Sequence, residues 1–247
     1  MPTVGELTAL YANFMLAPRR GRGVCRVCFN FTRDYELCYA CTGHPQMLDV
    51  VAPISYSVAH EQLHHVLGYY KQLTGDIARR LRVELAAVLW RHLLEHERCV
   101  ADAVGTPNFE LVTIVPSGER RRDRNHPLRA IVGQLVEPAR DRYERLLERS
   151  PREVQPRVFD PAKYTALRPL GGEHVLLIDD TWTTGANAQS AAAALKDAGA
   201  AAVGAVVIGR HLNREWHEND CRLRGIQRPF NWGRCALCGD RAHGDAP

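Results

Sequence analysis

The first half of the chain carries hydrophobic residues at helical spacing, whereas the second half carries them in short uninterrupted runs. Over residues 76–104, aliphatic side chains recur every three or four positions and predict a long amphipathic helix. A shorter helix is predicted over residues 58–73, and the first residues of the chain show the same spacing. The N-terminal region is therefore expected to be mainly helical, apart from a cysteine-containing stretch over residues 24–43.

Short runs of aliphatic residues, bounded by turn residues, predict the strands of a sheet. These strands cover residues 109–116, 174–178 and 202–208, with a further short strand over 157–159. Between them, helices are predicted over residues 127–150 and 186–198, and Gly199 ends the second of these. Because strands alternate with helices, we expect an α/β fold with a parallel sheet flanked by helices.

Composition places the chain among globular proteins of ordinary size. Its 247 residues are enough for one sizeable domain with small additions, and 45% of them are hydrophobic. The formal net charge of +4 is too small to indicate nucleic-acid binding by itself. No apolar run is long enough to span a membrane, and the N-terminus lacks the basic region of a signal peptide. We therefore expect a cytoplasmic protein without membrane contacts.

Cysteines are frequent for a chain that we expect to be cytoplasmic, and most of them occur in pairs separated by two residues. The first two pairs are Cys25, Cys28, Cys38 and Cys41, and their spacing is that of two chelating turns. Four thiolates arranged in this way close a tetrahedral zinc site without an open position. We expect structural Zn²⁺ here, with free or redox-active cysteine pairs as the alternative.

Another cysteine pair lies near the C-terminus and suggests a second zinc site. Its ligands would be His217, Cys221, Cys235 and Cys238, with His243 as a substitute. The loose spacing of these residues leaves this second site open. Cys99 lies late in the long predicted helix and is interpreted as a core residue.

The segment VLLIDDTWTTGAN, residues 175–187, places two acids and several hydroxyl groups after a buried strand. VLLI shows no alternation, which is typical of a strand buried on both faces, so Asp179 and Asp180 fall at its carboxyl end. The small residues that follow offer backbone N–H groups at the start of a helix, and such a turn binds phosphate. The two carboxylates suit a pair of vicinal hydroxyls or a nearby metal ion. Together these groups predict a site for a ribose 5-phosphate.

Other interpretations of the LLIDD stretch fit the rest of the chain less well. A Walker B strand requires a phosphate-binding GxxxxGK[ST] loop, which the sequence lacks. A receiver domain would carry its acids near its start and without threonines beside them. The remaining alternative is that this segment has only a structural role, as a buried strand followed by a solvated turn that contains acids.

The same segment resembles the phosphoribosyl pyrophosphate signature of type I phosphoribosyltransferases. The order of motifs resembles one branch of that family, the ComF-like or GntX-like proteins: a four-cysteine zinc module, a helical segment, a strand followed by the VPSG turn and then the signature. The resemblance implies a type I phosphoribosyltransferase fold. Its units would be an N-terminal helix with a zinc-ribbon-like module (1–50), a helical segment (51–106), the phosphoribosyltransferase core (107–212) and a tail containing cysteine and histidine (213–247).

The resemblance also implies roles for particular residues. Asp179 and Asp180 would bind the ribose 2- and 3-hydroxyls and stabilise positive charge on the ring. The residues around the 5-phosphate would be Thr181, Thr183, Thr184, Gly185 and Ala186. The pyrophosphate would meet the turn formed by Pro116, Ser117 and Gly118. Arg120, Arg121 and Arg122 would add charge there, with a solvated basic face as the alternative for these arginines. Trp182 receives no role.

The activity implied is transfer of phosphoribosyl from phosphoribosyl pyrophosphate, carrying Mg²⁺, to a small-molecule acceptor such as an amine or a nucleobase. Arg157 and Lys163 lie where the family has a flexible loop and are candidates to reach the pyrophosphate. That loop matches the family pattern only loosely. A sensor or adaptor that binds the ligand without turnover, of the ComF type linked to DNA uptake, is therefore the alternative. A homodimer and partners such as nucleic acid or DNA-uptake proteins stay open.

A third hypothesis comes from HEQLH at residues 60–64, which fits the HExxH pattern of zinc peptidases. On a helix, His60 and His64 would share one face, with Glu61 as a base and Glu84 as the third ligand. Short patterns of this kind also arise by chance, and a polar helix face is the alternative.

Overall fold

The structure is a computed structural model that describes residues 2–117, 123, 125–216 and 218–238. The segment before the first core strand holds α1 (Val4–Ala9), η1 (Tyr11–Asn13) and α2 (Tyr39–Thr42). The core then contains β1 (Val50–Val58), α3 (Gln62–Gln72), α4 (Gly75–Val104), β2 (Leu111–Ile114), β5 (His174–Trp182), α8 (Ala186–Asp197) and β6 (Ala202–Leu212), followed by α9 (Asn219–Arg224). Between β2 and β5 lie α6 (Pro127–Ala130), the π-helical turn η2 (Ile131–Leu135), α7 (Glu137–Arg140), β3 (Leu147–Arg149), η3 (Pro161–Lys163) and β4 (Tyr164–Ala166). No helix in the described part of the chain is both long and apolar enough to cross a membrane.

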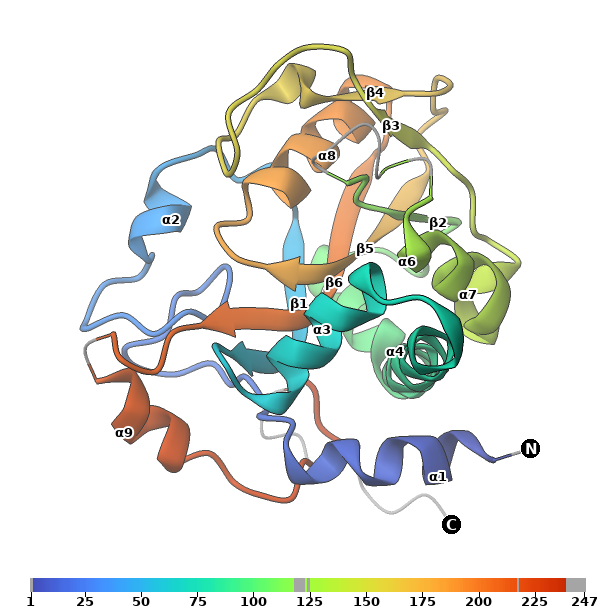
Figure 1. Cartoon of the computed structure of the whole chain (residues 1–247). Coiled ribbons are helices and arrows are strands. Elements are labelled where there is room, and N and C mark those ends of the chain that lie inside the picture. Colours follow the sequence, from blue (N-terminus) through green and yellow to red (C-terminus); the bar gives the residue numbers. More distant parts are fainter. Residues whose placement is uncertain (1, 118–122, 124, 217, 239–247) are drawn as a thin grey trace.

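One parallel sheet forms the centre of the molecule, with the strand order β1-β6-β5-β2 (Figure 1). Ala205 of β6 lies between Val51 of β1 and Leu177 of β5. Strand β2 pairs with β5 up to Ile114, which lies opposite Ile178. The carboxyl ends of β2 and β5 are therefore neighbours. β3 and β4 form a separate antiparallel pair.

Helices cover both faces of this sheet (Figure 1). On one face, Leu89 of α4 belongs to a buried cluster with Ile178 and Val206 of the strands. On the other face, Leu177 packs in a cluster with Ala191 of the alanine-rich helix α8. Small side chains on α8 let this helix approach the strands closely. The predicted α/β fold with a parallel sheet flanked by helices is confirmed.

Strand β1 is missing from the sequence prediction. The helix expected over 58–73 begins only at Gln62, and residues 50–58 are instead an edge strand in which every residue is buried. Pro53 lies inside this strand. Proline cannot donate to a ladder and therefore hides a strand in the sequence, but an edge position tolerates it. The range 51–106, predicted as a helical segment, thus also contributes one strand to the sheet.

The prediction of a single helix over residues 127–150 is also wrong. The chain forms α6, η2 and α7 in succession, and β3 occupies the last part of the range. A Cβ atom on Gly133, in the middle of η2, would lie 2.6 Å from Cδ1 of Tyr143, so the chain turns where a side chain would not fit. Residues 157–159 are not a strand either, and the strand of this region is β4.

Candidate functional site

The two acids of the signature lie in the last part of β5 and not beyond it. Asp179 pairs with Val207 of β6, and the ladder continues through Thr181 opposite Gly209. Adjacent residues of a strand point to opposite faces, so the two carboxylates meet different surroundings. Asp180 is buried with 3% exposure, whereas Asp179 is half-buried.

Two residues of α3 hold Asp180. The Tyr70 hydroxyl donates a hydrogen bond to Oδ2, and Lys71 Nζ lies 2.5 Å from the same oxygen. Burial alone would raise the pKa of Asp180, but Lys71 and these hydrogen bonds outweigh it and hold the pKa below its usual value. Asp180 is therefore an anion that the protein already neutralises. No pattern in the sequence indicates this contact, because Tyr70 and Lys71 resemble the end of any amphipathic helix.

Asp179 has the opposite electrostatic character. Burial, and next the negative charge of Asp180, raise the pKa of Asp179 to about 7. The backbone N–H of Asp180 donates a hydrogen bond to Oδ1 of Asp179 at 2.9 Å. Near neutral pH this carboxyl group exchanges between its acid and its anion, and a hydrogen-bond donor on a ligand would favour the anion.

The turn after β5 leads directly into the N-terminus of α8. Gly185 is the N-cap residue, with φ 86°. A Cβ atom there would run into the indole ring of Trp182, which is buried beneath the turn with 1% exposure. Thr184 Oγ1 accepts a hydrogen bond from the backbone N–H of Ala186 at 3.3 Å. The turn is thus fixed in place with the first amides of a 12-residue helix beside its threonines.

A cavity of about 690 Å³ opens beside this turn. Thr181, Thr183 and Thr184, which the resemblance implies as phosphate-binding residues, line it. Other walls come from α3, from the end of β6 and from the segment before α9, and they include His64, His65, Tyr69, Arg210, His211 and Trp216. The volume is in the range of small-molecule sites. The predicted phosphate-binding threonines therefore face a space that can hold a ligand.

Imidazole rings give this cavity an aromatic wall. The rings of His64 and His211 have centroids 5.2 Å apart, and His65 stacks on Tyr69 at 5.6 Å. Burial, and next the neighbouring imidazoles, lower the pKa of both His64 and His211. These two rings are therefore neutral at pH 7, and such rings can accept a proton. The HEQLH pattern predicts a different site for His64, that of a zinc peptidase.

The VPSG turn lies next to the end of β5. The backbone N–H of Val115 donates a hydrogen bond to the carbonyl of Ile178 at 2.9 Å, which continues the ladder by one residue. The Tyr164 hydroxyl donates to the carbonyl of Pro116 at 3.1 Å. Val115 and Ile178 are 63 positions apart in the sequence. The VPSG turn and the acid pair that follows Ile178 are nevertheless neighbours at one edge of the sheet.

Ser117 is the last described residue of that turn before a gap. Its backbone N–H donates to Oδ1 of Asp123 at 3.3 Å, and Arg129 lies 2.8 Å from the same oxygen. Asp123 thus anchors the turn from within the fold. Gly118 and the arginines at 120–122, which were expected near the pyrophosphate, lie outside the described residues.

The loop expected to cover the site places its two basic candidates differently. Arg157 lines the cavity, and its carbonyl accepts a hydrogen bond from Thr184 Oγ1 at 3.5 Å. Lys163 has 2% exposure, and its Nζ donates to the carbonyl of Val158 at 3.3 Å. Arg157 is therefore in position to meet a ligand, whereas Lys163, contrary to expectation, is not.

The HExxH stretch does not form the arrangement of a zinc peptidase. Helix α3 begins after Glu61, so His60 precedes the helix and takes a positive φ of 65°. The backbone N–H of His60 donates to Nδ1 of His64 at 3.2 Å. Glu61 forms an ion pair with Arg214, and Glu84 accepts a hydrogen bond from the N-terminal segment. The predicted pair of imidazoles on one helix face is therefore not present.

The four N-terminal cysteines converge as predicted. The group consists of Cys25, Cys28, Cys38 and Cys41, whose Sγ atoms all lie within 4.8 Å of one another and are buried. The sulfur atoms of Cys28 and Cys38 are 3.6 Å apart. The backbone N–H of Phe29 donates to the carbonyl of Cys25 at 3.0 Å and closes the first chelating turn. This group could bind zinc, and its four ligands would leave no open position.

A buried arginine joins this cysteine group to the cavity. Arg210, with 3% exposure, donates from Nε to the carbonyl of Cys28 at 2.9 Å and from Nη2 to its sulfur at 3.5 Å. Burial would lower the pKa of Arg210, but the thiolates of Cys28 and Cys38 more than offset it and raise the pKa. A buried guanidinium requires such nearby negative charge. Because Arg210 also lines the cavity, the cysteine module and the cavity share a wall.

A second group of metal-binding side chains differs from the predicted one. Its members are His96, Cys99, Cys235 and Cys238, whose ligand atoms also lie within 4.8 Å of one another. Cys221 is exposed and does not belong to it. His217 and His243 lie outside the described residues. The interpretation of Cys99 as a simple core residue is therefore wrong, and this group too could bind zinc. Among the described residues, the acidic turn forms no comparable metal group.

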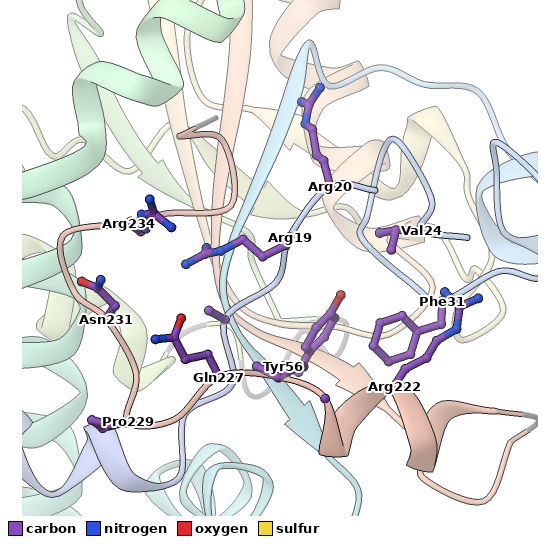
Figure 2. A pocket seen from close by; sticks show the side chains of 13 residues that line it. Arg19, Arg20, Val24, Phe31, Tyr56, Arg222, Gln227, Pro229, Asn231 and Arg234 are labelled. Atoms are coloured by element: carbon purple, nitrogen blue, oxygen red, sulfur yellow. The ribbon is translucent and has the colours of Figure 1, made fainter. Parts of the chain in front are cut away.

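Another cavity, of about 390 Å³, lies between the segment after α1 and the segment after α9 (Figure 2). Four arginines line it, namely Arg19, Arg20, Arg222 and Arg234. The guanidinium of Arg222 lies 5.6 Å from the ring centroid of Phe31. No carboxylate occurs among the described residues of its lining, so the cavity is electropositive.

Fold and site together define an α/β protein with a ligand-sized cavity at the carboxyl edge of a parallel sheet and two cysteine groups that could bind zinc. Comparison of the chain with protein-family models, with curated proteins and with solved structures finds no match in any of the three.

Proposed function

We propose that the protein binds phosphoribosyl pyrophosphate and transfers its phosphoribosyl group to a small nucleophile, an amine or a nucleobase. One observation carries the proposal. The segment 175–187 lies beside the VPSG turn, and its threonines line a cavity of about 690 Å³. In an open α/β sheet this edge is where ligands bind.

Each part of the ligand has a matching group. The 5-phosphate lies at the N-terminus of α8, where the turn offers amides and the hydroxyls of Thr183 and Thr184. Asp179 binds the ribose hydroxyls, because its carboxyl group is half-buried and forms no ion pair among the described residues, whereas Asp180 is paired with Lys71. The diphosphate lies toward Pro116 and Ser117.

Asp180 has a supporting role in this proposal. Its charge is balanced by Lys71, and it holds α3 against the end of β5. Lys71 is 37% exposed and can also face the diphosphate. Asp180 therefore positions a cation beside the leaving group, and the ribose contact falls to Asp179.

The reaction is a displacement at the anomeric carbon of the ribose. The bond from this carbon to the diphosphate oxygen breaks, the acceptor nucleophile forms the new bond, and pyrophosphate leaves with the electron pair. Asp179, as an anion, stabilises the positive charge that develops on the ring. The proton released by the acceptor passes to a neutral imidazole of the cavity wall, His64 or His211.

Metal ions enter the proposal in two ways. The four N-terminal cysteines hold structural Zn²⁺, because four convergent buried thiolates are the preferred set for this ion. Mg²⁺ would arrive on the diphosphate. The described residues at the acidic turn do not form a Mg²⁺ site of their own, since Asp180 is already paired with Lys71.

A second candidate function is a sensor or adaptor that binds the same ligand without turning it over. The burial of Lys163 favours it, because it leaves only Arg157, of the two basic candidates in the covering loop, to reach the diphosphate. The two functions share the binding site and differ only in pyrophosphate release.

Calorimetric titration with phosphoribosyl pyrophosphate and Mg²⁺ tests the shared site. We expect binding by the wild type and an affinity at least about tenfold lower in Asp179→Asn, the equivalent of one lost charged hydrogen bond. Asp102→Asn, at an exposed position on α4, is the matched control and should bind like the wild type. Absence of binding by the wild type would refute both functions.

Pyrophosphate release then separates the enzyme from the sensor. The wild type is incubated with ligand, Mg²⁺ and a panel of ammonia, amines and nucleobases. Release that depends on one acceptor and is lost in Asp179→Asn supports the transferase. Tight binding without release for any acceptor supports the sensor.

A further inference from the structure

The side chains of α4 and of the C-terminal segment meet in a group that no sequence motif connects. His96 and Cys99 are three positions apart on α4, so they share one helix face. Cys235 and Cys238 approach that face from the segment after α9. The sulfur atoms of Cys99 and Cys238 are 3.4 Å apart, and those of Cys235 and Cys238 are 3.1 Å apart.

The four ligand atoms gather around one point and could hold one metal ion. Zinc bonds to thiolates at about 2.3 Å, so a tetrahedral site places its sulfur ligands about 3.8 Å apart, and the sulfur atoms here would have to move apart slightly to reach that spacing. Nδ1 of His96 lies 3.5 Å from the sulfur of Cys238, which matches the edge of about 3.5 Å expected between a nitrogen ligand at about 2.0–2.1 Å and a sulfur ligand at about 2.3 Å from zinc. With three thiolates and one imidazole, all four positions of zinc are filled by the protein.

His96 is oriented as a metal ligand. Its Nε2 lies 2.5 Å from the backbone carbonyl of Trp232 and donates a hydrogen bond to it. That bond places the proton on Nε2 and leaves the lone pair of Nδ1 directed toward Cys238. A carbonyl partner on the far nitrogen is the usual outer contact of a metal-bound histidine. The ring is buried with 2% exposure, so solvent does not supply an alternative partner.

Backbone amides support the thiolates of the later pair. The N–H groups of Leu237 and Cys238 donate to the sulfur of Cys235 at 3.3 and 3.2 Å, and the N–H of Cys235 donates to Cys238 at 3.4 Å. Hydrogen bonds of this kind stabilise a charged sulfur. On the other side of the turn, Arg19 donates to the carbonyl of Cys235 at 3.1 Å and brings positive charge near the group.

We propose that His96, Cys99, Cys235 and Cys238 bind a second structural Zn²⁺ that fastens the C-terminal segment to α4. The soft thiolates select zinc over Mg²⁺ or Ca²⁺. The segment it fastens carries Phe230 and Trp232, which belong to the buried cluster between α4 and the sheet.

The same segment forms a wall of the arginine-lined cavity (Figure 2). Gln227, Pro229, Asn231 and Arg234 all precede Cys235 in that wall. Zinc at the second site therefore also fixes the shape of this electropositive cavity, although no cavity residue is a ligand.

Zinc content per chain tests the proposal directly. The full chain is expressed with zinc and assayed by elemental analysis. We expect two zinc ions per chain in the wild type and one in Cys235→Ser/Cys238→Ser. Cys221→Ser, which removes an exposed cysteine outside both groups, should retain two. Cys25→Ser/Cys28→Ser should retain one, now at the second site. A wild type with one zinc, or a Cys235→Ser/Cys238→Ser variant with two, would overturn the proposal.

X-ray absorption at the zinc edge gives an answer that needs no variant to fold. A four-sulfur site and a site with three sulfurs and one nitrogen average to about 3.5 sulfur and 0.5 nitrogen ligands per zinc. The expected spectrum of the wild type shows this mixture. A spectrum of four sulfur ligands alone would rule out His96 as a ligand and contradict the proposed site.

Discussion

Lys71 Nζ lies 2.5 Å from Oδ2 of Asp180, so a helix that precedes the acidic motif by more than a hundred residues neutralises one of its two acids. For Asp179, one position earlier, burial and next the charge of Asp180 outweigh the effect of Lys71 and raise the pKa to about 7. Two adjacent acids that sequence reasoning treated as equivalent therefore have different tasks.

Removal of the Lys71 cation should destabilise the fold. Lys71→Ala leaves the buried Asp180 carboxylate without its partner, and we expect the free energy of unfolding to fall by about 1–3 kcal/mol. This loss is smaller than that expected for a fully buried ion pair, because Lys71 is 37% exposed and solvent screens its charge. Urea unfolding measures it. Lys196→Ala, which breaks a more exposed pair with Asp49, should cost less than about 1 kcal/mol.

A double variant checks the cause of that loss. In Lys71→Ala/Asp180→Asn the unpaired charge is gone, so part of the stability should return. Equal losses in the single and the double variant would show that the stem of Lys71, and not its charge, is what stabilises this contact.

Asp179 should make stability depend on pH. Its pKa is raised in the fold to about 7 from 3.8, so between these values the folded state binds more protons than the unfolded state. Stability should therefore fall as pH rises from about 4 to about 7. Asp179→Asn should flatten this part of the profile, as measured by thermal unfolding at a series of pH values. A profile identical to that of the wild type would contradict the shift.

Gly185 should tolerate no side chain. Gly185→Ala meets both a positive φ of 86° and the ring of Trp182, and we expect a loss of about 2–4 kcal/mol together with weaker ligand binding. The matched control is Gly75→Ala, which has a φ of 73° but open space around its Cβ position. It should cost only about 1 kcal/mol. Equal costs, compared by urea unfolding, would mean that contact with Trp182 adds nothing.

Removal of zinc should destabilise the fold, and more strongly in the wild type than in a variant that lacks the second site. Because both cysteine groups form only in the folded state, a strong chelator should lower the midpoint of thermal unfolding by about 10 °C in the wild type. Cys235→Ser/Cys238→Ser should show a smaller further decrease with chelator, since only one ion remains to be lost. Calorimetric scans with and without chelator measure both. A midpoint unchanged by chelator in the wild type would argue against structural zinc.

The parts of the fold that sequence predicted are those with local signals. VLLI, an uninterrupted aliphatic run, is a buried strand, and CxxC pairs identify the first cysteine group. Strand β1 escaped detection because Pro53 interrupts its pattern and only its edge position makes that proline acceptable.

The missed site residues depend on distant contacts. His96 and Cys99 are ordinary members of an amphipathic helix until Cys235 and Cys238 reach them. Spacing alone predicts His217 and Cys221 as their partners, whereas the fold brings His96 and Cys99 of α4 to them. The Tyr70 and Lys71 contacts with Asp180 belong to the same class, since no periodicity in one segment reveals its partner in another.

The proposed second zinc site also has a consequence for biosynthesis. Cys99 and Cys238 are separated by 139 positions, so at about 5–20 residues per second the ribosome delivers the later cysteine about 7–28 s after the earlier one. During that interval α4 displays two ligands of an incomplete site. The second zinc site can therefore form only after Cys235 and Cys238 have left the ribosome, and only if zinc is available at that moment.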